Sequence, residues 1–215
     1  VLAFAVTAQA PAFAAKRVAL VLGNSAYTHA PALPNPVNDA NEVAAKLQAL
    51  DFTVSLAVDA TKAETDAILR EFANALEGAE VAIFFYAGHG LQVAGQNYLV
   101  PVDAKLAKER DLEFEAVRVD FILKQMELGR EDKTNVVFLD ACRDNPLSRS
   151  LARTMGTRSA SIGKGLAQID AGVGTFIAYS TQPGNVALDG KGTNSPFTEA
   201  LLKRITEPGR NLTSV

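Results

Sequence analysis

The chain has 215 residues and a mass of 22.8 kDa, a length that suits one domain with a substantial core better than two small ones. Its hydrophobic content of 48% and charged content of 21% are those of an ordinary globular protein. The net charge is -3 and residues of both signs are interspersed, so the sequence offers no basic face, and nucleic acid is not expected as a partner.

The N-terminal stretch VLAFAVTAQAPAFA is apolar and ends in a small-x-small pattern at Ala12–Ala14, which is typical of a signal peptidase site. We therefore predict that residues 1–14 are the remnant of a signal peptide whose positive start is missing, and that the protein is periplasmic or secreted. The alternative is an ordinary apolar N-terminal strand. Because no other stretch approaches the roughly 18 apolar residues that cross a bilayer, stable membrane insertion is not expected.

Strands and helices alternate along the first part of the chain. Buried strands are predicted for two apolar runs, at 17–23 and 79–88, and 52–59 is a further strand candidate. A helix is predicted to begin near Pro36, where apolar residues recur at helical spacing. A second helix is predicted over 61–76, with Thr61 as its N-cap and Glu64 completing a capping box.

The second part continues this alternation after a small hairpin, which is predicted over 91–103 around Ala94–Gly95. The remaining elements are a helix near 118–128, strands at 135–141 and 174–181, and a helix over 194–205 with Ser195 as N-cap and Pro196 at N1. This order predicts an α/β fold with a mostly parallel central sheet of about six strands and helices on both faces.

Two chemically special residues follow neighbouring strands of this predicted sheet. His89, in FFYAGHG, comes after the third strand, and Cys142, the only cysteine, comes after the fourth in VVFLDACRDNP. Asp140 and the residues from Ser180 to Gly184 belong to the same edge. Because ligands of such sheets bind beyond the carboxyl ends of the strands, we expect an active site here.

A histidine beside a cysteine can perform acyl-transfer chemistry. The imidazole pairs with the thiolate, which is the attacking form, and later protonates the leaving amine. The backbone N–H groups of Gly90 and Cys142 are candidates for an oxyanion hole. Taken singly, His89 and Cys142 would each suit a structural role, but together at adjacent strand ends they favour a dyad. One cysteine and two histidines make a poor zinc set, so no metal site is predicted.

The two motifs together resemble the His/Cys dyad of the caspase-like cysteine peptidases of clan CD. Cys142 follows His89 by 53 residues, and caspases place their histidine about 50 residues before the cysteine. LVLGNSAY and LPNPVNDA resemble the first strand and helix of bacterial metacaspase-like members, and residues 178–201 resemble the start of the caspase small subunit. The resemblance runs from Arg17 to Ile205. It implies a caspase-like three-layer sandwich over 15–215 and a cysteine-type endopeptidase, which is a hydrolase.

The resemblance also implies a preference at P1, the substrate residue before the cleaved bond. Caspases bind a P1 aspartate through arginines, whereas metacaspases bind Arg or Lys through aspartates. Asp39 stands where the metacaspase pattern places such an acid, Asp140 lies two residues before the nucleophile, and Ser180 and Asp189 are further S1 candidates. Two carboxylates accept a guanidinium and repel a P1 acid. The alternatives are that Asp39 decorates a helix start and that Asp140 binds loop amides.

The long stretch after Cys142 is rich in Ser, Arg and Gly and shows little hydrophobic periodicity. Caspase-type enzymes are often processed between the strand that bears the cysteine and the next strand. We therefore predict self-cleavage within residues 143–165, with Arg153 and Arg158 as the candidate sites.

The sequence also departs from the family pattern. DACRDN differs from the caspase QACRG and from the plant-type metacaspase DSCHSG. Many metacaspases need calcium, but no dense acidic cluster with ligand spacing is seen; Asp103 could contribute to such a site. No cofactor is therefore predicted with certainty, and calcium dependence is left open. The rival hypotheses are a catalytically silent caspase-like module that binds peptides, and another thiol hydrolase or acyltransferase on the same scaffold.

Overall fold

The computed structural model describes residues 15–141, 151, 162–163, 165–182 and 192–207. Its centre is a parallel sheet with strand order β2-β1-β3-β7-β9. The bounds of these strands are Arg17–Gly23 (β1), Thr53–Val58 (β2), Val81–Ala87 (β3), Thr134–Asp140 (β7) and Thr175–Tyr179 (β9). Every neighbouring pair is parallel, as crossover connections through helices require.

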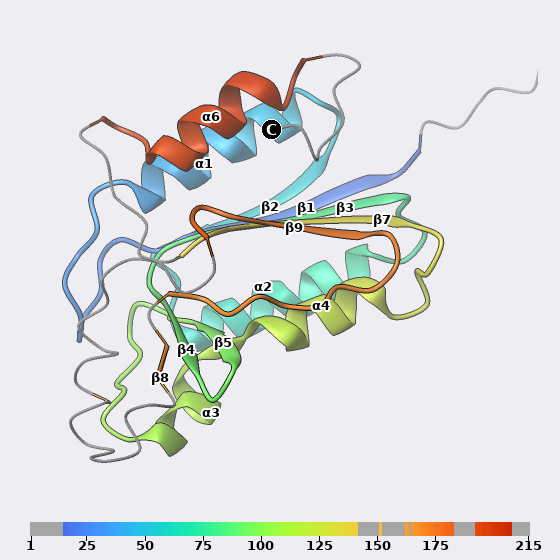
Figure 1. Ribbon diagram of the computed structural model, residues 1–215. Helices are drawn as coiled ribbons and strands as arrows, with labels where there is room; N and C mark the ends of the chain where they lie inside the picture. The colour runs from blue at the N-terminus through green and yellow to red at the C-terminus, as the bar shows by residue number, and fades with distance from the viewer. Residues whose placement is uncertain (1–14, 142–150, 152–161, 164, 183–191, 208–215) are drawn as a thin grey trace, which may run out of the picture.

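Helices cover both faces of this sheet (Figure 1). One face carries α1 (Pro36–Gln48) and α6 (Pro196–Arg204), which lie side by side. The other carries α2 (Lys62–Ala75) and α4 (Val119–Glu127). The predicted three-layer α/β class is therefore confirmed, although the described central sheet has five strands rather than about six.

The central strands read as continuous apolar runs because both of their faces are buried. In β3, Phe84 packs in the core cluster on the side of α2 and α4, whereas Phe85 packs in the cluster on the side of α1. Both side chains are 0% exposed. A strand covered on both faces loses the polar-apolar alternation of a surface strand, which is why continuous apolar runs identified the inner strands.

The helix starts follow the predicted capping. Thr61 accepts the backbone N–H of Glu64, and the Glu64 carboxylate accepts that of Thr61, which completes the capping box at the start of α2. Thr61 donates two hydrogen bonds to the Glu64 carboxylate, and both stabilise its ionised form and lower the pKa of Glu64. The bond from the Thr61 backbone has the larger effect, and the bond from its hydroxyl the smaller one. Ser195 caps α6 by accepting the N–H of Thr198 at 3.0 Å.

A second, antiparallel sheet lies at the end of the molecule that carries the β4–β5 hairpin (Figure 1). Its strand order is β6-β5-β4-β8, with bounds Val117–Arg118, Gln96–Leu99, Gly90–Val93 and Ile162–Gly163. The predicted turn is confirmed, since Ala94 and Gly95 both have positive φ, 50° and 81°, as a two-residue hairpin turn requires. The sequence analysis did not predict β6, β8, the 3-10 helix η1 (Glu109–Asp111) or the short helix α3 (Leu112–Glu115).

Arg130 joins the two helices of one layer to the central sheet. Its buried guanidinium donates to the carbonyl oxygens of Leu76 and Ala79, after α2, and to Asn135 Oδ1 in β7. Its Nε donates to the Met126 carbonyl in α4 at 3.0 Å. These bonds give donors to carbonyl groups near the ends of α2 and α4, where the last carbonyls of a helix have no partner within the helix. In the described part of the chain, no helix is long and apolar enough to cross a membrane.

Candidate active site

The turn that carries His89 packs against the end of β7. Strands β3 and β7 are adjacent, and their register ends with Ala87 opposite Asp140. The Gly88 N–H donates to the Asp140 carbonyl at 3.2 Å. A Cβ on Gly90 would lie 2.6 Å from the Ala141 carbonyl oxygen, so only glycine fits this approach. Cys142 is the next residue in the sequence after Ala141 and lies outside the described residues.

The His89 side chain is buried, at 1% exposure, and its ring is oriented by the segment that follows β1. Its Nε2 lies 2.9 Å from the Pro31 carbonyl oxygen. Because a carbonyl can only accept, this contact assigns the hydrogen to Nε2, and Nδ1 is then the basic nitrogen of the neutral ring. The Tyr27 ring packs against the imidazole with centroids 4.5 Å apart.

The glycines beside His89 serve the protein's own packing. A Cβ on Gly88 would lie 2.6 Å from the hydroxyl oxygens of both Tyr27 and Tyr86. Gly90 approaches Ala141, as described, and begins β4, where it pairs with Leu99. The requirement for glycine at both positions therefore already follows from contacts inside the chain.

Two of the three S1 candidates that carry carboxylates, Asp39 and Asp140, converge on one serine. Asp39, in the first turn of α1, is 0% exposed, and its Oδ1 accepts the backbone N–H of Ser195 at 3.0 Å. Asp140, at the end of β7, is 1% exposed, and its Oδ2 accepts the Ser195 hydroxyl hydrogen. Two acids distant in sequence thus lie within reach of a single residue at the sheet edge. The sequence analysis expected Ser195 as a cap but missed this link.

The remaining predicted residues are placed as follows. The Ser180 N–H donates to the Leu139 carbonyl at 3.0 Å, which places Ser180 at the same sheet edge, and its Oγ is buried. Asp103 accepts the Lys62 N–H at the start of α2. Among the described residues no group of three or more His, Cys, Asp and Glu side chains is placed to hold a metal ion. The positions of three predicted site residues lie outside the described ranges: Asp189, Arg153 and Arg158.

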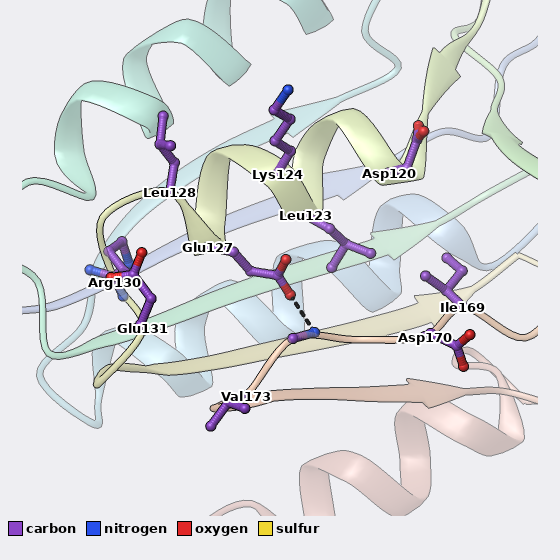
Figure 2. Close-up of a pocket in the computed structure, with 11 residues that line it drawn as sticks. Asp120, Leu123, Lys124, Glu127, Leu128, Arg130, Glu131, Ile169, Asp170 and Val173 are labelled. Carbon is purple, nitrogen blue, oxygen red and sulfur yellow. Dashed lines mark hydrogen bonds between the residues drawn. The ribbon is translucent and has the colours of Figure 1, made fainter.

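A hollow of about 530 Å³ lies elsewhere, between α4 and the segment before β9 (Figure 2). Figure 2 shows Leu123, Glu127 and Ile169 on its walls, and the Gly172 N–H donates to Glu127 Oε1 at 2.9 Å. No predicted catalytic or S1 residue lines it. The chemistry of this hollow therefore gives no reason to place the reaction there.

Comparison with known proteins agrees with this fold. Residues 16–215 match the family model described as the caspase domain. The human mucosa-associated lymphoid tissue lymphoma translocation protein 1 and its homolog from Mus musculus are each 35% identical over 127 residues, 59% of this chain. The chain spans only 15% of the length of these two relatives.

Two solved structures share the architecture. The Drosophila initiator caspase Dronc matches with a TM-score of 0.55 and 12% identity, over 86% of this chain and 61% of that one. A protein from Geobacter sulfurreducens matches with a TM-score of 0.59 and 20% identity, over 87% of this chain and 81% of that one. These two likenesses concern the fold alone.

The sheet, its helix layers and the His89 turn define a caspase-like α/β protein. The family match over residues 16–215 then shows that the chain belongs to the caspase-domain peptidase family. The name of this family denotes cysteine-type peptidases.

Proposed function

We propose that the chain is a metacaspase-like cysteine endopeptidase of bacterial type, which cleaves after Arg or Lys with His89 and Cys142 as its dyad. The observation that carries the proposal is the contact between the Gly88–Gly90 turn and the Asp140–Ala141 end of β7. Cys142, the only cysteine, is the next residue in the sequence after Ala141, and its thiol is the proposed partner of the buried imidazole of His89.

In the proposed reaction the imidazole of His89, through the Nδ1 that the Pro31 contact leaves basic, takes the thiol proton of Cys142, and the thiolate attacks the scissile carbonyl carbon. The N–H groups of Gly90 and Cys142 donate to the resulting oxyanion. When the tetrahedral intermediate collapses, the C–N bond breaks and the imidazolium gives its proton to the leaving amine. Water then hydrolyses the thioester, again with His89 as base, which releases the acid and restores the thiol. The Pro31 contact supports this role because it leaves Nδ1 as the basic nitrogen.

Charge supports a basic P1 residue. Asp39 and Asp140 are both buried and both bonded to Ser195, so two acid groups share one small volume. A guanidinium carries its charge on a planar fork that can bond to two carboxylates at once, whereas a P1 carboxylate would add a like charge. Ser180 and Asp189 are proposed as further S1 residues. Calcium dependence and export to the periplasm or beyond belong to the same proposal and need their own measurements.

The direct test is hydrolysis of a fluorogenic peptide with Arg at P1 against its twin with Asp at P1, each with and without calcium. We expect the wild-type protein to release the fluorophore from the arginyl peptide only. The Cys142→Ala variant should release it from neither peptide. Cleavage of the aspartyl peptide would overturn the proposed preference. If neither the intact chain nor a chain clipped within 149–164 cleaves either peptide, the result would favour the catalytically silent module that binds peptides.

The self-processing hypothesis has a separate test. Purified wild-type protein should lose intact mass on incubation and yield fragments that end at Arg153 or Arg158, because these residues offer a basic P1 in the stretch that follows Cys142. Mass spectrometry identifies the new termini. The Cys142→Ala chain should stay whole, and the Arg153→Gln, Arg158→Gln double variant should be cut more slowly. Equal integrity of the wild-type and Cys142→Ala chains would contradict self-cleavage.

A further inference from the structure

Two tyrosine hydroxyls and both peptide groups of His89 form a closed hydrogen-bonded ring. The His89 N–H donates to the Tyr27 hydroxyl at 2.7 Å, and the Tyr86 hydroxyl donates to the His89 carbonyl at 2.8 Å. The two hydroxyl oxygens are 3.4 Å apart. The Tyr86 hydroxyl also lies 3.1 Å from the Val100 carbonyl oxygen, and either hydroxyl can donate in the contact between the two tyrosines. The ring therefore runs from His89 through Tyr27 and Tyr86 back to His89.

The oxygen of Tyr27 is held in place from outside the ring. Asp59 Oδ1, at the end of β2, accepts the backbone N–H groups of Ser25 and Ala26 at 2.7 and 2.8 Å. The Thr28 N–H donates to the Val102 carbonyl at 2.8 Å. The segment that carries Tyr27 is thus fixed on both sides of that residue, so its hydroxyl is a rigid acceptor.

The same segment also carries Pro31, whose carbonyl binds His89 Nε2. The histidine is consequently held at its backbone by one residue and at its ring by another, four positions apart. A peptide group that shifted would carry the ring away from Pro31, because the ring is attached to that backbone through only two rotatable bonds. Backbone placement therefore decides which nitrogen is the base and where it points.

We propose that Tyr27 and Tyr86 are positioning residues for the imidazole of His89, with Tyr27 the stronger of the two. This inference rests on the proposed function for its kinetic consequence. Tyr27 ranks above Tyr86 because the His89 carbonyl has a second donor. It also accepts the Val100 N–H at 3.0 Å, so Tyr86→Phe leaves that carbonyl bonded. In Tyr27→Phe the buried His89 N–H loses the Tyr27 oxygen as its acceptor, which is costly to replace.

Tyr98 provides a matched control. It is 5% exposed, against 9% for Tyr27, and its hydroxyl donates to Glu113 Oε1 at 3.0 Å. Burial, which has the larger effect, and the hydrogen bond to Glu113 raise the pKa of Tyr98 to about 12. Its phenol is therefore protonated near neutral pH, like that of an ordinary tyrosine. Tyr98→Phe therefore deletes a buried, bonded hydroxyl without touching the ring around His89.

The experiment measures the rate at which the Nε2 hydrogen of His89 exchanges with solvent. Imidazole NMR monitors this rate in the Cys142→Ala variant, where no catalysis is needed. The chain has only two histidines, so a His29→Asn variant assigns the signals. We expect exchange about tenfold to a hundredfold faster in Tyr27→Phe, a smaller increase in Tyr86→Phe and none in Tyr98→Phe. The amide of Leu20, buried in β1, should exchange at the wild-type rate in all three.

In the active chain, Tyr27→Phe should lower kcat about tenfold or more and change KM less than about twofold. Unchanged Nε2–H exchange in Tyr27→Phe would overturn the positioning role, as would equal acceleration at Leu20, which indicates general destabilisation. If the exchange result holds but the wild-type chain cleaves no peptide, the proposed function fails while the positioning of His89 stands.

Discussion

Replacement of His89 with asparagine should lower kcat for the arginyl peptide about a thousandfold, because the variant lacks the base that ionises Cys142 and the acid that protonates the leaving amine. Asparagine is polar and of similar size, so it suits the buried site between Pro31 and Tyr27. Steady-state kinetics measures the loss. His29 is exposed, and His29→Asn should keep the wild-type rate.

A second measurement separates chemistry from folding in this variant. The rate at which iodoacetamide alkylates Cys142 near neutral pH reports its thiolate fraction. It should fall in His89→Asn and stay unchanged in His29→Asn. A variant that lacks His89 yet keeps more than a tenth of the wild-type kcat would contradict its role as the base.

Replacement of Asp140 with asparagine is expected to reduce kcat/KM for the arginyl peptide about a hundredfold, because a charge-assisted bond to the guanidinium becomes a neutral one. The amide oxygen of the new side chain can still accept the Ser195 hydroxyl hydrogen, so the cap of α6 should survive. Asp39→Asn should act in the same direction. Asp111→Asn is the control, because its carboxylate also accepts a backbone N–H, that of Lys108, and it should leave kcat/KM unchanged.

The decisive comparison uses a peptide with norleucine at P1, which has a long side chain and no charge. The Asp140→Asn loss should fall on the arginyl peptide and spare the norleucyl one. Equal losses on both peptides would show that Asp140 serves only to anchor α6. The Asp39→Asn, Asp140→Asn double variant should lose less than the two single losses multiplied, since both acids contact Ser195 and act as one unit.

The sequence predicted the framework because its signals are local. The buried run of β3 and the capping box of Thr61 and Glu64 each lie within one element, so periodicity and spacing identify them. The placement of His89 at a strand end could be predicted in the same way. Strands β6 and β8 could not, because each spans two residues and is too short to show an alternation.

The surroundings of the candidate site were missed because their contacts are distant in sequence. Tyr27 and His89 are 62 positions apart, and no local pattern connects them. Ser195 was predicted from its place before Pro196, yet its two bonds to acids from α1 and β7 depend on how helices pack against the sheet. The close approach of the glycines beside His89 to Tyr27, Tyr86 and Ala141 likewise joins residues that no local pattern connects.

The span of the Asp39–Ser195 contact has a consequence for the newly made chain. These residues are separated by 156 positions, and their bond closes only after β7 and α6 have docked on a parallel sheet, a slow kind of pairing. A ribosome-bound chain that has not yet released α6 therefore lacks the residue that joins the two acids. Under the proposed function, cleavage after basic residues would therefore begin only once α6 has docked.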